Sequence, residues 1–193
     1  MLLKLIEDVE RAIEHECYFA ALALALTLPD ICGEAEFPKV GNGARYTKWC
    51  RQFVCEEHPS DNPYSGDMPY LNDDILYNLR CAFLHRGTPN PNENIYKGKL
   101  PKYKDDRCKI DHFILEITDP DTPDGELSMV SCSTGMKIDH REITVGVRDI
   151  CYRLCVAAKK YYEENTDKFT FFNFDLKDNR KKNNPFYRLQ GEE

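Results

Sequence analysis

The chain has 193 residues, of which 41% are hydrophobic and 31% are charged. That length is enough for one domain with a real core, which buries ~70% of the surface of the unfolded chain, and the composition is typical of a soluble globular protein. The net charge of −7 argues against a non-specific nucleic-acid binder, because the affinity of such proteins comes from neutralising phosphates.

The first residues carry no secretory signal, because Lys4, Glu7 and Asp8 interrupt the apolar pattern. The apolar run from Ala20 to Leu28 is too short to span a bilayer. Nine cysteines, an odd number without an export signal, are most simply reduced thiols of a cytoplasmic protein. We therefore expect a cytoplasmic protein with no membrane partner.

Two helices are predicted in the N-terminal third. The first covers about residues 2–28, and Pro29 and Gly33 are expected to end it. A stripe of apolar residues at helical spacing would face the core, namely Leu5, Ile6, Val9, Ile13, Ala20 and Leu24. The second helix covers about residues 46–57 and presents Trp49 and Phe53.

The third predicted helix, about residues 72–86, has well-defined ends. Asn72 is a good N-cap, Asp73 and Asp74 suit the positive end of the helix dipole, and Gly87 supplies the stop. One face of this helix forms an apolar stripe of Ile75, Leu76, Leu79, Ala82 and Phe83. This is the most strongly patterned segment of the chain.

Arg80 and His85 lie on opposite flanks of that stripe, roughly 140° apart around the helix. Residues at that angle are not expected to converge within one helix. The back face between them carries Tyr77, Cys81 and Leu84, and two-fold pairing of two chains through these residues could bring both Arg–His pairs to one seam. Alternatively, another element of the same chain covers the back face, Arg80 is a structural ion-pairing residue and His85 is a C-terminal cap.

The two residue types can together perform phosphodiester chemistry. A guanidinium binds a phosphate as a planar fork that is always charged, and an imidazole passes protons near neutral pH. The spacing alone is not specific, because Arg51–His58 and Arg107–His112 also fit it. His58 precedes Pro59, which disfavours a helix, and His112 begins an alternating, strand-like segment. Only the third helix holds both residues in one uninterrupted helical pattern.

A basic stretch follows this helix. Residues 97–109 contain six Lys or Arg against two Asp, and Tyr96 and Tyr103 could stack on bases. The predicted RNA-binding residues are Arg86, Lys99, Lys102 and Lys104. The alternative is a solvated loop whose charges have no function.

The last third departs from a plain helical bundle. Residues 113–117 and 127–131 alternate like two strands, so about 110–132 is predicted to be an antiparallel β-hairpin. Residues 169–176 would add a third strand. The fourth helix is predicted over about 144–165, and a basic tail covers 177–193. The inward residues of the fourth helix are Val147, Ile150, Cys151, Leu154, Ala158 and Tyr161. The expected fold is mainly α, a four-helix bundle with a small antiparallel insertion between its last two helices.

Metal and cofactor signals are poor. Cys108, His112, Cys132 and His140 could supply four zinc ligands, but their spacing is irregular and no Cys-x2-Cys occurs. No phosphate-cradling glycine motif and no serine nucleophile motif is present. We therefore expect no metal and no cofactor.

The segment Leu79-Arg-Cys-Ala-Phe-Leu-His-Arg-Gly87 resembles the Arg-x4-6-His signature of HEPN-superfamily ribonucleases. The resemblance covers the helical bundle of a single domain, residues 1–193, and implies a metal-independent endoribonuclease with Arg80 and His85 as catalytic residues. It also implies a homodimer with a composite site, an RNA substrate, a role in toxin–antitoxin pairs or phage defence, and a possible antitoxin partner. Cys81 departs from the pattern, because many catalytic members have a polar residue after the arginine. The alternative is a non-catalytic HEPN-like module that binds a protein or a nucleotide.

Overall fold

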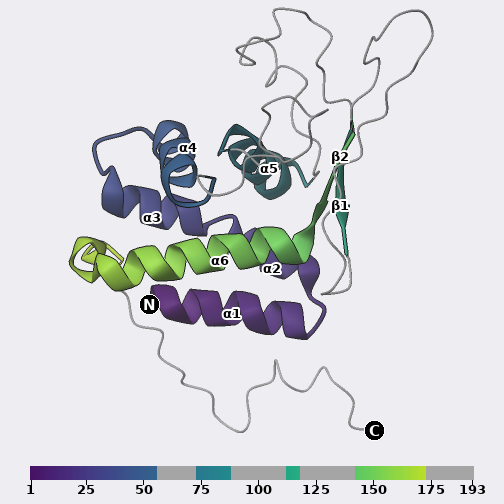
Figure 1. Cartoon of the computed structure of the whole chain (residues 1–193), viewed down its shortest axis with the longest axis horizontal. Coiled ribbons are helices and arrows are strands. Elements are labelled where there is room, and N and C mark those ends of the chain that lie inside the picture. The colour runs from purple at the N-terminus through teal and green to yellow at the C-terminus, as the bar shows by residue number, and fades with distance from the viewer. Residues whose placement is uncertain (56–72, 88–111, 118–141, 173–193) are drawn as a thin grey trace, which may run out of the picture.

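The structure is a computed structural model that describes residues 1–55, 73–87, 112–117 and 142–172. Within these residues the chain is mainly helical, with a small two-stranded sheet. The elements are α1 (Leu2–Glu14), α2 (Tyr18–Ala25), α3 (Leu28–Glu36), α4 (Asn42–Phe53), α5 (Asp73–Arg86), β1 (His112–Glu116), β2 (Glu142–Gly146), α6 (Val147–Glu164) and the short 3₁₀ helix η2 (Thr166–Phe169). Figure 1 shows α6 crossing the middle of the fold, with α1 on one side and α3 and α4 on the other.

The single first helix predicted over residues 2–28 is wrong, because the chain turns back between α1 and α2. Glu16 has a left-handed backbone, φ 58°. The amide of Cys17 donates to the carbonyl of Ala12 at 2.7 Å, and that of Glu16 donates to Ile13 at 3.1 Å. These two bonds are those of a Schellman motif, which ends a helix and reverses the chain. A glycine usually occupies the left-handed position. Because a glutamate is found there instead, the sequence did not indicate that the helix ends at this point.

Pro29 was predicted to end a helix, but it lies in the first turn of α3 instead. A proline is favourable there because the first amides of a helix have no partner within the helix and the proline backbone angle is already helical. Gly33 likewise continues α3. A Cβ atom at Gly33 would lie 3.2 Å from the carbonyl oxygen of Arg45 in α4, so the missing side chain allows close packing of α3 on α4.

The later helices match their predictions apart from their ends. α4 spans Asn42–Phe53 where 46–57 was predicted, and α5 spans Asp73–Arg86 where 72–86 was predicted. Gly87 has φ +64° and ends α5 as expected, whereas the predicted N-cap, Asn72, lies outside the described residues. α6 begins at Val147 rather than Thr144. Every residue expected to face inward from the last helix is buried.

The predicted antiparallel hairpin is not confirmed, and the described sheet is parallel instead. β1 pairs in parallel with β2, in register from His112 opposite Glu142 to Glu116 opposite Gly146. The predicted last helix begins at about residue 144, inside β2. However, Ile143 and Val145 alternate with Thr144, as a strand requires. Parallel strands need a long connection, which residues 117–141 supply. The expected partner strand 127–131 and most of 169–176 lie outside the described residues, and Phe169 belongs to η2.

All described helices and β2 contribute to one hydrophobic core. Its largest fully buried side chains are Trp49, Tyr46, Leu2, Leu22, Leu26, Leu28, Ile75, Leu76, Leu79, Ile150 and Leu154. In α5 the predicted stripe is confirmed, because four of its members are buried and Phe83 packs half-buried against the core. In α2 the buried face differs from the predicted one, because Ala21 and Leu22 are buried and Ala20, which was expected to face the core, is exposed. The Glu16 turn between α1 and α2 causes that difference.

Candidate functional site

Helix α5 is linked to α4 near its start and ends in a regular last turn at Gly87. Near its start, Arg51 of α4 forms an ion pair with Asp73 at 2.5 Å. At its end, the amide of Gly87 donates to the carbonyl of Phe83 at 3.2 Å. His85 therefore lies in the last turn, where its side chain is exposed.

Arg80 and His85 touch within one chain. The Nη1 atom of Arg80 lies 2.9 Å from the Nε2 atom of His85. The expectation that the two would not converge within one helix is therefore wrong. That expectation considered only the direction in which each residue leaves the helix, whereas the long arginine side chain bends towards the last turn. A second chain is not needed to bring the pair together.

The contact specifies the hydrogen arrangement of His85. A guanidinium can only donate hydrogen bonds, so Nε2 accepts, and a neutral ring must then carry its proton on Nδ1. The tautomer is inferred from this contact. The lone pair of Nε2 is thus occupied by the Arg80 hydrogen bond, so His85 can accept a proton from a substrate only when the guanidinium moves off Nε2.

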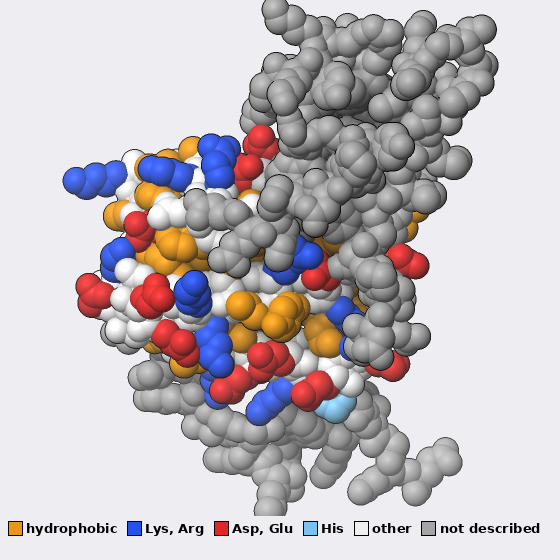
Figure 2. Space-filling view, viewed as in Figure 1, with side chains coloured by type: hydrophobic (Ala, Val, Ile, Leu, Met, Phe, Trp, Pro, Cys, Tyr) orange, Lys and Arg blue, Asp and Glu red, His pale blue; other side chains and the backbone are white. Residues whose placement is uncertain are grey.

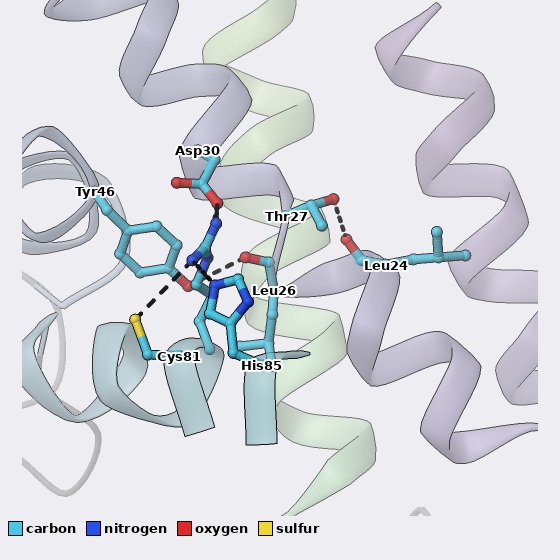
Figure 3. Close-up of polar contacts among 8 residues, drawn as sticks. Leu24, Leu26, Thr27, Asp30, Tyr46, Cys81 and His85 are labelled. Carbon is cyan, nitrogen blue, oxygen red and sulfur yellow. Dashed lines mark hydrogen bonds and ion pairs between the residues drawn. The ribbon is translucent and has the colours of Figure 1, made fainter. Parts of the chain in front are cut away.

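Asp30 is a member of the cluster that the sequence did not indicate. Its Oδ2 atom accepts from Nε of Arg80 at 3.0 Å and lies 2.9 Å from Nη2. The two residues are 50 positions apart in the chain, and Asp30 by itself has the appearance of an ordinary acidic residue in the first turn of α3. Figure 3 shows Asp30 and His85 on either side of these polar contacts. The arginine is thus held between a carboxylate and an imidazole.

Burial and the ion pair oppose each other at this contact. Burial raises the pKa of the Asp30 carboxyl above its ordinary value, although the charge and hydrogen bond of Arg80 act to lower it. Burial also acts to lower the pKa of Arg80, but Asp30 and Cys81 raise it above its ordinary value. Both shifts are upward, so burial prevails at the carboxyl and the ion pair prevails at the guanidinium. Because the atoms lie within 3.0 Å, we treat both groups as charged at neutral pH.

Helix α4 forms the back of the site. Tyr46 is fully buried, donates to the carbonyl of Leu26 at 3.3 Å and packs its ring against Tyr77, with centroids 5.4 Å apart. A Cβ atom at Gly43 would lie 2.7 Å from the Tyr77 hydroxyl. The absence of a side chain at Gly43 therefore gives room for Tyr77.

The structure places some of the residues predicted for the dimer interface, RNA binding and zinc binding, and the others lie outside the described residues. Tyr77, Cys81 and Leu84, the predicted dimer interface, are half-buried, and α4 of the same chain covers part of Tyr77. For Tyr77, the structure therefore matches the alternative in which another element of the same chain, and not a second chain, covers the back face of α5. Arg86 is exposed at the end of α5. The basic residues Lys99, Lys102 and Lys104 lie outside the described residues, as do Cys108, Cys132 and His140 of the weak zinc pattern.

The charge on the visible surface is mixed. Figure 2 shows Lys and Arg interspersed with Asp and Glu over the described part of one face, with apolar side chains between them.

Over the ranges that the structure describes, no group of three His, Cys, Asp or Glu could hold a metal ion. By length and composition alone, the stretch Tyr18–Glu36 is apolar enough to cross a membrane, and half of its most apolar window is buried in the fold. Core helices and signal sequences both have these features.

The fold and site define a mainly α domain with a surface histidine paired to a half-buried, carboxylate-bound arginine. No protein family, curated protein or solved structure matches the chain.

Proposed function

We propose that this protein is a metal-independent endoribonuclease of the HEPN type, acting through Arg80 and His85. The observation that carries the proposal is the 2.9 Å contact between the guanidinium of Arg80 and Nε2 of His85. It joins a phosphate-binding cation and a proton-accepting ring in one surface cluster. A bundle of the HEPN type is part of the same proposal.

The reaction follows from these two groups. His85 removes the proton from a ribose 2′-hydroxyl, which attacks the adjacent phosphorus. Arg80 stabilises the negative charge that develops on the phosphoryl oxygens. The 2′-O–P bond forms and the P–O5′ bond breaks. The departing O5′ takes a proton from His85, acting as general acid, or from water, which leaves a cyclic phosphate and a 5′-hydroxyl end. Asp30 contacts no reacting atom, so its proposed role is to position Arg80.

The proposal includes a cytoplasmic role in a toxin–antitoxin pair or in phage defence, with an antitoxin as a protein partner. The RNA would also contact Arg86 and the basic residues Lys99, Lys102 and Lys104. These assignments rest on the resemblance of the α5 sequence to HEPN ribonucleases and on the charge of residues 97–109.

The deciding experiment incubates total RNA with the purified protein in EDTA and separates the products on a gel. We expect cleavage by the wild type and none by His85→Ala or Arg80→Ala. Arg80→Lys should also be inactive, because a lysine lacks the planar fork that contacts two partners at once. The matched control is His15→Ala, which removes another exposed histidine, next to α1. Equal cleavage by all variants would overturn the site, and cleavage that requires an added metal would overturn the mechanism.

A non-catalytic interaction module is the second candidate, and one observation favours it. The Arg80 side chain is only 21% exposed and is already bound by Asp30, as expected for a structural residue. In that case the purified protein binds a protein or a nucleotide and leaves RNA intact. The gel separates the two candidates directly.

A further inference from the structure

An exposed aromatic stack joins α2 to α5, the helix that carries Arg80 and His85. Phe19, near the start of α2, is 75% exposed, the most exposed large hydrophobic side chain among the described residues. Its ring lies almost parallel to that of Phe83 in α5, with 9° between the planes and 6.0 Å between the centroids. One face of Phe19 is thus held by Phe83, and most of the rest of the ring meets solvent.

The position of Phe83 ties this stack to the site. Phe83 lies three residues after Arg80, the spacing at which side chains are neighbours on a helix, whereas His85, two residues after Phe83, leaves α5 on another side. Phe19 therefore extends the surface of α5 away from the polar cluster. A flat ligand on Phe19 would lie beyond Phe83, whose ring centroid is 6.0 Å from that of Phe19, so it would be more than one helical turn from the Arg80 guanidinium.

Each of the two helices that form the stack has a guanidinium group near it. Arg80 lies on the α5 side. On the α2 side, Tyr18 precedes Phe19 and accepts a hydrogen bond from Arg148 of α6 at 2.8 Å, and the same guanidinium lies 5.3 Å from the Tyr18 ring. One guanidinium thus lies against Tyr18, the residue before Phe19, and the other lies on the helix that carries Phe83, where Asp30 binds it. Proteins that bind single-stranded nucleic acids combine these features, because cations hold the backbone while aromatic rings stack on bases.

We propose that Phe19, supported by Phe83, is a stacking platform for an unpaired base of the same RNA that is cleaved at the Arg80–His85 pair. The proposal rests on the proposed ribonuclease function and specifies its substrate class. A base in a duplex is stacked on both faces and cannot lie on Phe19, so the platform selects single-stranded RNA, loops or ends. Every base has a flat face, so the platform selects an unpaired structure rather than a sequence.

The test measures binding apart from cleavage. An unpaired RNA octamer with one 2-aminopurine is titrated into the cleavage-deficient His85→Ala protein, and its fluorescence reports stacking. Adding Phe19→Ala should raise Kd about tenfold and remove the fluorescence change due to stacking. Phe19→Trp should keep both, whereas Phe19→Leu, which is apolar but has no ring, should behave like Phe19→Ala.

Phe171 provides the matched control. It is a 49% exposed phenylalanine stacked on another, Phe169, at 22°, and it follows η2, which contacts α3 and α6. Phe171→Ala should leave the Kd for the octamer unchanged. A fully paired RNA duplex should bind equally to proteins with and without Phe19.

The outcomes separate this proposal from the proposed function. Equal Kd and equal fluorescence with and without Phe19, or no binding of the octamer, would overturn the platform. If the wild type cleaves RNA and Phe19→Ala cleaves it with the same KM, the platform fails and the nuclease stands. If Phe19-dependent stacking is seen and the wild type cleaves nothing, the nuclease fails and the platform stands.

Discussion

The guanidinium of Arg80 is held between two side chains of different character, and Asp30 is the one that fixes its orientation. Asp30→Asn removes the charge but nearly preserves the shape. We expect kcat for RNA cleavage to fall by about 100-fold, since a misplaced catalytic group costs that much, while KM changes little. The nitrogen NMR shifts of His85 should also change, because its contact with Arg80 is disturbed.

Asp149 supplies the control for this prediction. It forms an ion pair with Arg153 at 2.5 Å on the surface of α6, with comparable exposure. Asp149→Asn should therefore leave both kcat and the His85 shifts unchanged. An Asp30→Asn enzyme as active as the wild type would show that Arg80 needs no carboxylate to hold it.

At this scale the sequence revealed the residue types but not their geometry. The uninterrupted helical pattern selected Arg80 and His85 over two other pairs with the same spacing, and the structure places both in α5. Their contact was missed because a helical wheel gives the direction of a side chain and not its reach. Asp30 was missed because a contact between residues 50 positions apart depends on how α3 and α5 pack.

The turn between α1 and α2 gives a prediction about an element. Glu16 has φ 58°, a conformation that costs an L-residue about 1–2 kcal/mol and costs glycine less. Glu16→Gly should therefore raise the free energy of unfolding by ~0.5 kcal/mol. Glu7→Gly, an exposed position in the middle of α1, should lower it by ~1 kcal/mol. Urea denaturation of both variants checks the prediction, and a destabilised Glu16→Gly protein would contradict it.

A second element-level prediction concerns η2. The carboxylate of Glu36 at the end of α3 accepts from Tyr161 at 2.7 Å and from Lys168 at 2.5 Å. The hydrogen bond from Lys168 is the largest cause of the lowered pKa of Glu36. At neutral pH, Glu36→Gln should lower the free energy of unfolding by ~1 kcal/mol, as measured by urea denaturation.

The sign of the pH dependence follows from that lowered pKa. As the pH falls below 4.5, the ordinary value of Glu36, the unfolded chain takes up the proton before the folded one, so the stabilisation is lost. The difference between wild type and Glu36→Gln should therefore shrink as the pH falls through the folded pKa. Lys168→Met should flatten the same part of the curve. A difference that stays constant from pH 7 to pH 3 would contradict the assignment.

Elements were predictable where periodicity and stop signals agreed. α5 and α6 have both an apolar stripe and a polar end, and their buried faces are as predicted. The α1–α2 turn has neither glycine nor proline between Glu14 and Tyr18, so the apolar pattern concealed it. The sequence did not identify β2 as the partner of β1. Two segments, 127–131 and 142–146, alternate like strands, and which of them pairs with β1 depends on tertiary contacts.

For the whole molecule, a homodimer is still our proposal, with Leu84 at its seam. The half-buried Leu84 would be covered by a second chain. Light scattering should give the wild type twice the chain mass of 22.5 kDa. Leu84→Glu should give a folded single chain with little activity, because like charges at a desolvated seam are costly. Val156→Glu, at a 47% exposed position on α6, is the control and should keep the mass of the wild type. A monomeric wild type with full activity would show that the pair in one chain is sufficient.

The parallel pairing of β1 with β2 has a consequence for the order of folding. The α1–α2 turn closes over three residues, whereas the strands can meet only after residues 117–141 have been looped out. Closing a longer loop costs more chain entropy, and non-local contacts form slowly. We expect the helical layers to assemble first and the strand pair to join last. Because β2 leads directly into α6, the last event of folding takes place at the start of the helix on which the core is built.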